Sequence, residues 1–358
     1  NLKLLKMNKV NIPKNRIRKL NTFSLGKEPY ELQSLNSIDC NSNLIDLCSN
    51  DYLGLSRNLD VVEAAHKISL SEGLGSGSSR FITGSRPIHS ILESQLGEWL
   101  NQDKVLLFPS GFQANIAAVQ ALANRKSIIL ADKYIHNSLL VGIKVSGAKL
   151  VRFAHNDSKD LEKKILKFNS SENPILVIIE SLYSMEGSIA PLEEITKICK
   201  KYNAELLVDE AHAIGILGPE GKGLSFDFSS CISMITGTFG KSFGSGGAFI
   251  ACNSKIGEHL IQTSGAFRYT TALSPALAAG ALKSLEIIRN NKEWGLNLLS
   301  NSKIWKKELI RNFNYPVQGD CQILSIIIGQ EDKTMLLQKY LEKNGFLAVA
   351  IRPPTVPN

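Results

Sequence analysis

The sequence has little of what marks a secreted or membrane-bound chain. Its six cysteines show no Cys-x-x-Cys spacing, and several lie in apolar runs where free thiols pack as small hydrophobic side chains. No run of about 18 apolar residues occurs, and the opening segment 1–7 is too short and too interrupted by lysine for a signal-peptide core. We therefore expect reduced thiols, a cytoplasmic location and no membrane partner.

The composition also lacks a block of one charge and a long disordered tract. Hydrophobic residues make up 43% and charged residues 21% of the 358 residues, which is ordinary for a globular protein. The formal net charge of +8 comes from scattered lysines, so it indicates phosphorylated ligands weakly and nucleic acid more weakly still. We expect no nucleic-acid partner.

The length predicts two domains, or one large α/β unit with an appendage. Residues 1–45 are polar and basic and are expected to form an N-terminal arm. Residues 46–289 carry the alternating pattern described below and are expected to form the large domain. From 290 to 358 helix, strand and helix follow, which predicts a small C-terminal domain.

Short apolar runs alternate with segments of helical periodicity. Strands are expected at 44–48, 104–108, 128–131, 150–153, 175–179, 205–208, 231–235 and 247–252, and helices lie between them, for example at 59–71, 88–100 and 192–202. This alternation predicts a parallel sheet covered on both faces. Polar residues cluster after the strands, at the edge where open α/β sheets bind ligands.

Lys241 lies in the glycine-rich stretch 235–249 between two expected strands, so it occupies a tight turn. The small neighbours let a flat ligand approach, and partial desolvation of the amine would lower its pKa toward the nucleophilic range. Taken alone, a Gly-Lys-Ser is more often a surface lysine in a loop. Groups at other strand ends reverse that balance.

Four of these groups suit an aromatic cofactor. Asp209 ends a buried strand with His212 three residues on, whereas His136 and Ser184 follow two other strands. Asp209 alone would equally fit a helix cap, and a lone histidine is more often solvated. Together with Lys241 they meet the demands of pyridoxal phosphate: an imine-forming amine, a carboxylate on the ring nitrogen (Asp209), a stacking platform (His136), and donors to the ring oxygen (His212, Ser184).

The cofactor's phosphate also has candidate partners. Gly111 and Phe112 open a helix directly after a strand, where free backbone N–H groups and the positive end of the helix dipole attract an anion. The hydroxyl of Thr238 would add another donor. The glycines at 73, 75 and 77 do not match a dinucleotide fingerprint, and their loop would be either flexible or part of the substrate site.

These residues resemble those of the α-oxoamine synthases, which are fold-type I pyridoxal-phosphate enzymes. The resemblance covers almost the whole chain, through the motifs at 50–54, 110–112, 132–136, 208–212 and 238–241. It implies an α/β, aminotransferase-like fold with a mostly parallel central sheet, helices on both faces and a smaller C-terminal α+β domain. Lys241, His136, Asp209 and His212 would be catalytic, and Ser110 would join the phosphate site.

Other roles follow from the resemblance alone. Thr270 and Thr271 would lie near the phosphate of the neighbouring subunit in a homodimer, and Arg352, Arg18 and Asn50 would bind substrate. The motif at 351–357, together with 153–157, is similar to the branch that condenses L-alanine with a pimeloyl thioester in biotin synthesis. The acyl carrier would be coenzyme A or a carrier protein.

The sequence departs from the family pattern at two places. Ala213 stands where the family has glycine after the histidine, a change that could tighten the pocket. The chain ends at Asn358, soon after the arginine motif, so we expect the small domain to be incomplete at its end.

Several alternatives compete with this interpretation. Asp209 to His212 spells a helicase-type DEAH box, but a nucleotide-driven motor needs an upstream phosphate loop, and the Gly-Lys-Ser lies downstream with Ile235 in place of its first glycine. A non-catalytic subunit of the same fold would not need the lysine. Metal binding by His136, His155 and His212 lacks ligand spacing, so no metal is expected. Within the family, a glycine C-acyltransferase is the alternative enzyme.

Overall fold

The computed structural model describes residues 13–35, 43–168, 173–353 and 355–356, so the opening segment and Cys40 lie outside the described residues. The chain divides into two compact units. The larger comprises Asn50–Arg311 with Gln318–Ser325, and the smaller draws on Asn1–Ser49, Asn312–Val317 and Ile326–Asn358.

A seven-stranded sheet forms the centre of the larger unit, in the order β4-β10-β9-β8-β7-β5-β6. Only β10 runs antiparallel to its neighbours β4 and β9, and the other pairs are parallel. The mostly parallel sheet is therefore as expected. The strands are β4 (Lys104–Phe108), β5 (Ile128–Asp132), β6 (Lys149–Phe153), β7 (Ile175–Glu180), β8 (Glu205–Asp209), β9 (Met234–Thr238) and β10 (Ala248–Cys252).

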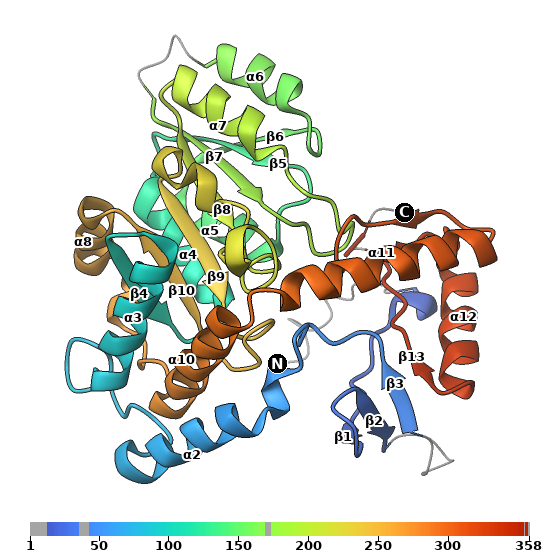
Figure 1. Ribbon diagram of the computed structural model, residues 1–358. Helices are drawn as coiled ribbons and strands as arrows, with labels where there is room; N and C mark the ends of the chain where they lie inside the picture. The colour runs from blue at the N-terminus through green and yellow to red at the C-terminus, as the bar shows by residue number, and fades with distance from the viewer. Residues whose placement is uncertain (1–12, 36–42, 169–172, 354, 357–358) are drawn as a thin grey trace, which may run out of the picture. The chain divides into compact units, whose positions relative to one another are not determined.

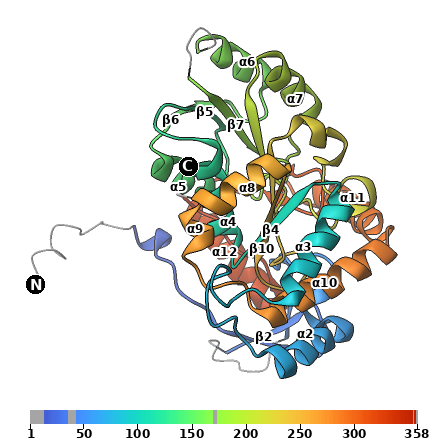
Figure 2. The same cartoon turned by 90° about the vertical axis from the view of Figure 1, so that its left-hand side faces the viewer.

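Helices cover both faces of this sheet, because its central strands are apolar on both sides (Figures 1 and 2). One buried cluster joins Val105 and Leu107 of β4 to α3, α6, α7 and α10, and the other joins Leu106 and Phe108 to α4, α5, α8 and α9. The helices are α3 (Pro87–Leu100), α4 (Gly111–Leu122), α5 (Asn137–Ser146), α6 (Ser158–Leu166), α7 (Leu192–Lys201), α8 (Ser254–Thr263), α9 (Gly265–Arg268) and α10 (Pro275–Asn290).

The remaining elements of this unit include α2 (Leu59–Glu72), which packs on α10, and α11 (Trp294–Asn312). The division at residue 290 that the sequence suggested falls before α11. Leu298 and Leu299 of this helix pack against a buried cluster of the larger unit that contains Ile216, and Gly295 allows the helix backbone to approach the Ile216 carbonyl. Contacts therefore place α11 with the larger unit.

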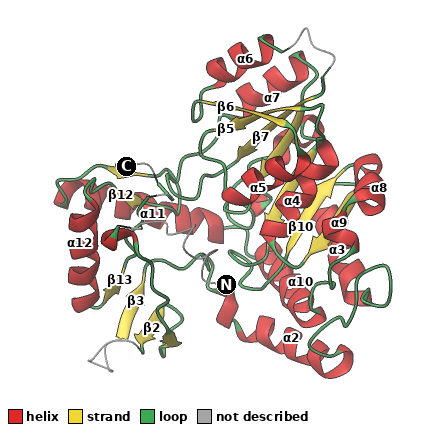
Figure 3. Cartoon of the chain, turned by 180° about the vertical axis from the view of Figure 1, so that it is seen from behind, coloured by secondary structure: helices red, strands yellow, loops and turns green. Residues whose placement is uncertain are grey.

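The smaller unit holds a four-stranded sheet in the order β1-β2-β3-β13, beside α12 (Figure 3). Its N-terminal strands are antiparallel, and β13 pairs in parallel with β3. Described residues of the expected arm and of the C-terminal segment thus share one sheet. The elements of this unit are β1 (Phe23–Leu25), β2 (Glu31–Ser34), β3 (Asn43–Asp46), α12 (Glu331–Lys343) and β13 (Phe346–Leu347). Elsewhere in the chain, β11 (Val317–Gln318) and β12 (Ser325–Ile326) form a separate two-stranded pair.

Candidate active site

The ends of five strands of the central sheet meet at one pocket of the larger unit. Strands β4, β5, β7 and β8 contribute residues at or just after their carboxyl ends, and β9 contributes both its last residues and the turn that follows. The cavity has a volume of about 230 Å³ and is lined by Gly111, Phe112, Asn115, His136, Ser138, Glu180, Asp209, Ala211, His212, Thr236, Gly237, Thr238 and Lys241. The structure therefore assembles the expected lysine, carboxylate, histidines and helix N-terminus in one place.

Lys241 lies on the turn that joins β9 to β10, as the glycine pattern predicts. Phe239 and Gly247 are hydrogen-bonded across the base of this turn, and the N–H of Gly244 donates to the Lys241 carbonyl at 2.8 Å. Gly244 has a φ of +57° and lies against the backbone of Ser56, so this position excludes a side chain. Both ends of the turn are thus held, and the Lys241 backbone is fixed.

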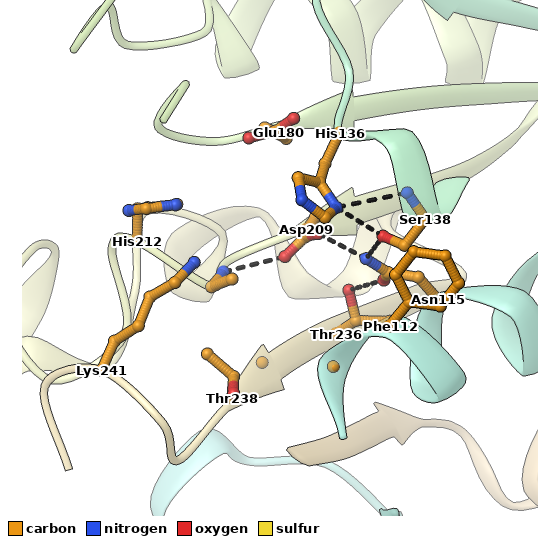
Figure 4. A pocket seen from close by; sticks show the side chains of 13 residues that line it. Phe112, Asn115, His136, Ser138, Glu180, Asp209, His212, Thr236, Thr238 and Lys241 are labelled. Atoms are coloured by element: carbon orange, nitrogen blue, oxygen red, sulfur yellow. Dashed lines mark hydrogen bonds between the residues drawn. The ribbon is translucent and has the colours of Figure 1, made fainter. Parts of the chain in front are cut away.

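The Lys241 amine points toward the space between His212 and Asp209 (Figure 4). Burial lowers its pKa, whereas the acidic side chains of Asp209 and Glu180 act in the opposite direction. It forms no ion pair with any other residue that the structure describes. A largely desolvated amine without a direct carboxylate partner is suited to act as a nucleophile and a base.

Asp209 ends β8 and is only 5% exposed. Its Oδ1 accepts a hydrogen bond from the N–H of Ala211 at 2.9 Å, and its Oδ2 accepts one from Asn115 Nδ2 at 2.7 Å. The first bond belongs to the turn after the strand, as the helix-cap alternative would require. The second bond and the pocket position show that the carboxylate does more than close this turn.

His136 caps α5 and also opens to the pocket. Its Nδ1 accepts from the N–H of Ser138 at 3.3 Å and lies 2.7 Å from the Ser138 hydroxyl, whereas the residue as a whole is exposed. Burial of the ring edge and the positive charge of Lys241 lower its pKa, and Asp209 opposes them. The ring is therefore neutral at pH 7, with a face available for stacking.

His212 is buried, and burial is the main reason that its pKa falls well below the usual value. The Tyr52 hydroxyl donates its one proton to Asn50 Oδ1 at 3.1 Å, and its oxygen lies 2.7 Å from His212 Nδ1. Asn50 is not among the pocket-lining residues, and these two contacts connect it to His212. The 50–54 motif and the histidine after β8 therefore form one hydrogen-bonded group.

The N-terminus of α4 has the features of a phosphate site. Ser110 caps the helix by accepting from the N–H of Gln113 at 3.3 Å, so the preceding N–H groups of Gly111 and Phe112 remain directed out of the helix end. A Cβ on Gly111 would meet only Thr238, at 3.6 and 3.7 Å. The glycine thus keeps open a small space between α4 and Thr238. The Thr238 hydroxyl donates to the Gly247 carbonyl at 3.0 Å in this structure, so it would have to rotate to serve as a phosphate donor.

Glu180 is a pocket residue that the sequence reasoning missed. It is 3% exposed, its Oε1 has no hydrogen-bond partner, and burial, followed by the charge of Asp209, raises its pKa well above the usual range. Burial thus favours the protonated form of this carboxyl. The unpaired oxygen lies where a bound cofactor or substrate would supply a polar partner, which fits a site built around a ligand.

The other missed residues are Asn115, Ser138 and Thr236, all of which are buried polar side chains. Asn115 lies inside a segment of helical periodicity, and Thr236 lies within a strand. The only sequence signal for them was polarity at positions that the apolar pattern assigns to the core.

Several expected site residues lie elsewhere. Ser184, Thr270 and Thr271 do not line the pocket. Arg352 and Arg18 belong to the smaller unit, where Arg352 donates to the Asn15 carbonyl and Arg18 donates to the Thr355 hydroxyl. Their roles toward substrate or a second subunit stay predictions.

Ala213 does not line the pocket either. Its methyl group is fully buried in a cluster with Leu182, Ile216 and Leu217. The residue after the histidine therefore contributes to packing, and its effect on the pocket stays a prediction.

The described residues contain no group of three or more His, Cys, Asp or Glu side chains arranged to hold a metal ion. His155, one of the three histidines considered as metal ligands, instead bridges Asp132 and Ser188 at 3.0 and 2.8 Å. No helix among these residues is both long and apolar enough to cross a bilayer. The cysteines that the structure describes are all free thiols.

A lysine on a β-hairpin turn, a strand-end carboxylate, an open imidazole face and a helix N-terminus on one edge of this sheet define a fold-type I pyridoxal-phosphate enzyme. The sequence matches the aminotransferase class I and II family over residues 42–358, and the chain belongs to that family. This result leaves the DEAH-box interpretation without support.

Within this family, the chain is similar to proteins named 8-amino-7-oxononanoate synthase and to serine palmitoyltransferase structures. It is 37% identical over 318 residues to a putative 8-amino-7-oxononanoate synthase of Glaesserella parasuis, covering 88% of this chain and 84% of the relative. An 8-amino-7-oxononanoate synthase structure from Francisella tularensis aligns with a TM-score of 0.75 and 29% identity, over 87% of this chain and 89% of that one. A serine palmitoyltransferase of S. paucimobilis, solved with a bound adduct of pyridoxal phosphate and myriocin, aligns with a TM-score of 0.90 and 26% identity, over 99% and 89% of the two chains.

Proposed function

We propose that this chain is a pyridoxal-phosphate-dependent acyltransferase that condenses L-alanine with a pimeloyl thioester. The products are 8-amino-7-oxononanoate, an intermediate of biotin synthesis, together with carbon dioxide and a free thiol. The relatives named for this reaction support the proposal. The structural observation that carries it is the largely buried Lys241 amine in one pocket with Asp209, His136 and the N-terminus of α4.

The pocket residues fit this cofactor. When bound, pyridoxal phosphate supplies an aldehyde that condenses with amines and a ring that takes up the electron pair of a broken bond. Asp209 would hold a proton and its positive charge on the ring nitrogen, and the open face of His136 would support the ring. The space that Gly111 leaves beside Thr238 would receive the phosphate. Glu180 Oε1, which lacks a partner, would gain one on loading.

Lys241 has a second task, which is to move the α-proton of L-alanine. Because burial lowers its pKa, the neutral amine is more accessible near pH 7 than that of an exposed lysine. Arg352 is the proposed ligand of the alanine carboxylate. Holding that carboxylate fixes which bond at the α-carbon is aligned for cleavage, and orientation of this kind lowers the barrier without adding a catalytic group.

The overall chemistry sets the measurable products. The deprotonated carbon forms a bond to the thioester carbonyl, the thiol leaves, and the β-keto acid that results loses its carboxylate as carbon dioxide. Each turnover therefore releases one thiol and one carbon dioxide. A hydrolase acting on the thioester would release the thiol and the free acid but no carbon dioxide, so the thiol and carbon dioxide signals together identify the condensation.

We further propose a homodimer in the cytoplasm, in which Thr270 and Thr271 reach the phosphate of the neighbouring subunit. This assembly is supported by the resemblance of the 270–271 motif to the family pattern. Sedimentation of the holoenzyme should give a dimer, and a fully active monomer would contradict it.

The deciding experiment offers the protein pimeloyl-CoA, or a pimeloyl carrier protein, with alanine, glycine or serine in turn. Free thiol and carbon dioxide are followed together. Alanine should be preferred, and glycine should react weakly, because one methyl contact contributes only about 1–3 kcal/mol to discrimination. Acetyl-CoA with glycine outperforming pimeloyl-CoA with alanine would replace this proposal by a glycine C-acyltransferase.

A further inference from the structure

Asn115 is a buried amide on an otherwise apolar face of α4. Its neighbours Ala114, Ala117, Ala118 and Val119 fill the core between this helix and the sheet. Asn115 itself is 4% exposed and lines the pocket. A buried amide persists in a core only where its donors and acceptor are paired, so its partners are informative.

The three partners of Asn115 come from three different elements: Asp209 ends β8, Ser138 lies in the first turn of α5, and Thr236 lies in β9. Its Nδ2 donates to Asp209 Oδ2 at 2.7 Å and to Ser138 Oγ at 2.9 Å, and its Oδ1 accepts from the Thr236 hydroxyl at 2.8 Å. Figure 4 shows these contacts as one continuous network beneath His136. The network members Asn115, Asp209, Ser138 and Thr236 are each at most 5% exposed.

This network fixes the orientation of the amide. Turning the Asn115 side chain over would place its Oδ1 against the Asp209 carboxylate, where two acceptors would repel each other. The Thr236 hydroxyl, which can donate to Oδ1, matches the observed orientation. Asp209 therefore receives two N–H donors, one on each oxygen, and its remaining lone pairs are free to face the cavity.

The same network reaches the histidine. Because Ser138 Oγ accepts from Asn115, its own proton is available to His136 Nδ1, 2.7 Å away. The backbone N–H of Ser138 also donates to this nitrogen. With two donors directed at Nδ1, the neutral ring carries its proton on Nε2.

We propose that Asn115 is a positioning residue that holds the Asp209 carboxylate and the His136 ring as one hydrogen-bonded unit, with Thr236 fixing the orientation of the amide. This inference rests on the proposed function, because it matters for catalysis only if the cofactor ring lies between these two groups. Asn115 contacts neither substrate nor cofactor in this assignment. It sets the direction of the carboxylate that meets the ring nitrogen and the tautomer of the imidazole that meets the ring face.

The test compares wild type with Asn115→Leu, which keeps the side-chain size but removes all three hydrogen bonds. The first readout is the His136 ring nitrogens of the apoprotein, observed by ¹⁵N-histidine NMR and assigned with His136→Gln. Wild type should show a single tautomer with the proton on Nε2. Asn115→Leu should raise the share of the tautomer protonated on Nδ1, because the Ser138 hydroxyl is then free to accept from that nitrogen and only the backbone N–H of Ser138 still favours the Nε2-protonated form.

The second readout is cofactor binding. The dissociation constant of pyridoxal phosphate should rise about tenfold or more in Asn115→Leu, as for loss of an interaction with a charged group. The pH dependence of the bound cofactor's absorption should also shift, because the ring nitrogen loses a correctly directed carboxylate. A residue with only a packing role would move neither the tautomer nor this pH profile.

A matched pair at Thr236 keeps the test decisive if Asn115→Leu folds poorly. Thr236→Ser retains the hydroxyl donor and should behave like wild type, whereas Thr236→Val should move both readouts toward those of Asn115→Leu. Ser284→Ala removes another buried hydrogen bond of the larger unit, from Ser284 Oγ to the Phe243 carbonyl at 2.7 Å, and should lower stability alone.

The outcomes separate this inference from the proposed function. If the wild-type apoprotein does not bind pyridoxal phosphate, the proposed function fails. If wild type binds it and the Asn115 and Thr236 variants keep the wild-type tautomer, affinity and pH profile, the positioning role is overturned while the proposed function stands.

Discussion

Replacing Gly111 by alanine should separate the stability of the fold from its affinity for the cofactor. The added Cβ would lie 3.6 Å from Thr238 Cβ and 3.7 Å from Thr238 Oγ1, which are ordinary van der Waals distances. Gly111 is the first residue of α4 and does not have a left-handed φ. Alanine can therefore adopt this conformation without strain.

The two expected effects have opposite signs. Glycine to alanine at a compatible position stabilises a fold by about 0.4–1 kcal/mol, so the melting temperature of the apoprotein should rise by roughly 1–4 °C. The methyl group, however, occupies the space between the helix end and Thr238 that we assign to the phosphate. Loss of one hydrogen bond to a charged group costs about 1.5–3 kcal/mol, which raises the dissociation constant of pyridoxal phosphate roughly 10- to 150-fold.

The assay titrates the apoprotein with pyridoxal phosphate and follows the cofactor's absorption, with a thermal melt of the same sample. Gly265→Ala is the matched control, because Gly265 also opens a helix and its Cβ would meet only Tyr269, at 3.7 Å. It should change stability in the same direction and leave cofactor affinity alone. Unchanged affinity in Gly111→Ala would refute the assignment of the phosphate to the N-terminus of α4.

Three further changes test the pocket. Lys241→Ala should lower product formation by about 10²–10⁴-fold, which is the range for removing a proton-transfer group. The cofactor of this variant should remain removable by gel filtration after borohydride treatment. Retained turnover would exclude Lys241 from the chemistry. Asp209→Ala removes the carboxylate proposed to hold a proton on the ring nitrogen, and it leaves the Asn115 Nδ2 donor short of an acceptor. Exchange of the alanine α-proton, followed by NMR in deuterium oxide, should therefore slow, and normal exchange would contradict this role of Asp209. Burial raises the pKa of Glu180 in the folded protein above its value near 4.3 in the unfolded chain. Between these two pKa values the native state holds a proton that the unfolded chain has released, so the free energy of unfolding falls as pH rises. Glu180→Gln lacks this pH dependence, so its melting temperature relative to that of wild type should be higher at pH 8 than at pH 5. An equal difference in melting temperature at the two pH values would show that Glu180 is ionised.

The alternating pattern predicted the large unit well, because parallel strands buried on both faces give near-continuous apolar runs. Strand β4 was predicted residue by residue, and β5, β7 and β8 to within one residue at their ends. The strand expected at 231–235 begins later, at Met234, because the preceding segment forms a 3₁₀ helix up to Cys231. The small strands β1, β2 and β13 were missed, since strands of this length leave little periodicity and gain stability only from pairing far along the chain.

The pocket was predictable where a residue type is tied to a strand end or a glycine turn, as for Lys241, Asp209 and His136. Asn115 could not be recognised in this way. Its position inside a helix indicates only a polar residue on an apolar face, and its three partners come from segments 23 to 121 residues away only after folding. Glu180 was overlooked for a related reason: a glutamate at a strand end indicates solvent exposure unless the three-dimensional surroundings are known.

The short turn between β9 and β10 has a consequence for where this chain tolerates changes in length. Most strands of this sheet that follow one another in the chain are joined through an α-helix, which can gain or lose a turn without moving the strand ends. The segment 239–247 has no helix, is hydrogen-bonded at its base and lies against Ser56 through Gly244. An inserted residue there would displace the reactive amine itself. Insertions, deletions and the new termini of a circularly permuted protein should therefore be accepted in exposed connections elsewhere in the larger unit, and a library of such variants should show the fewest active members with changes between 239 and 247.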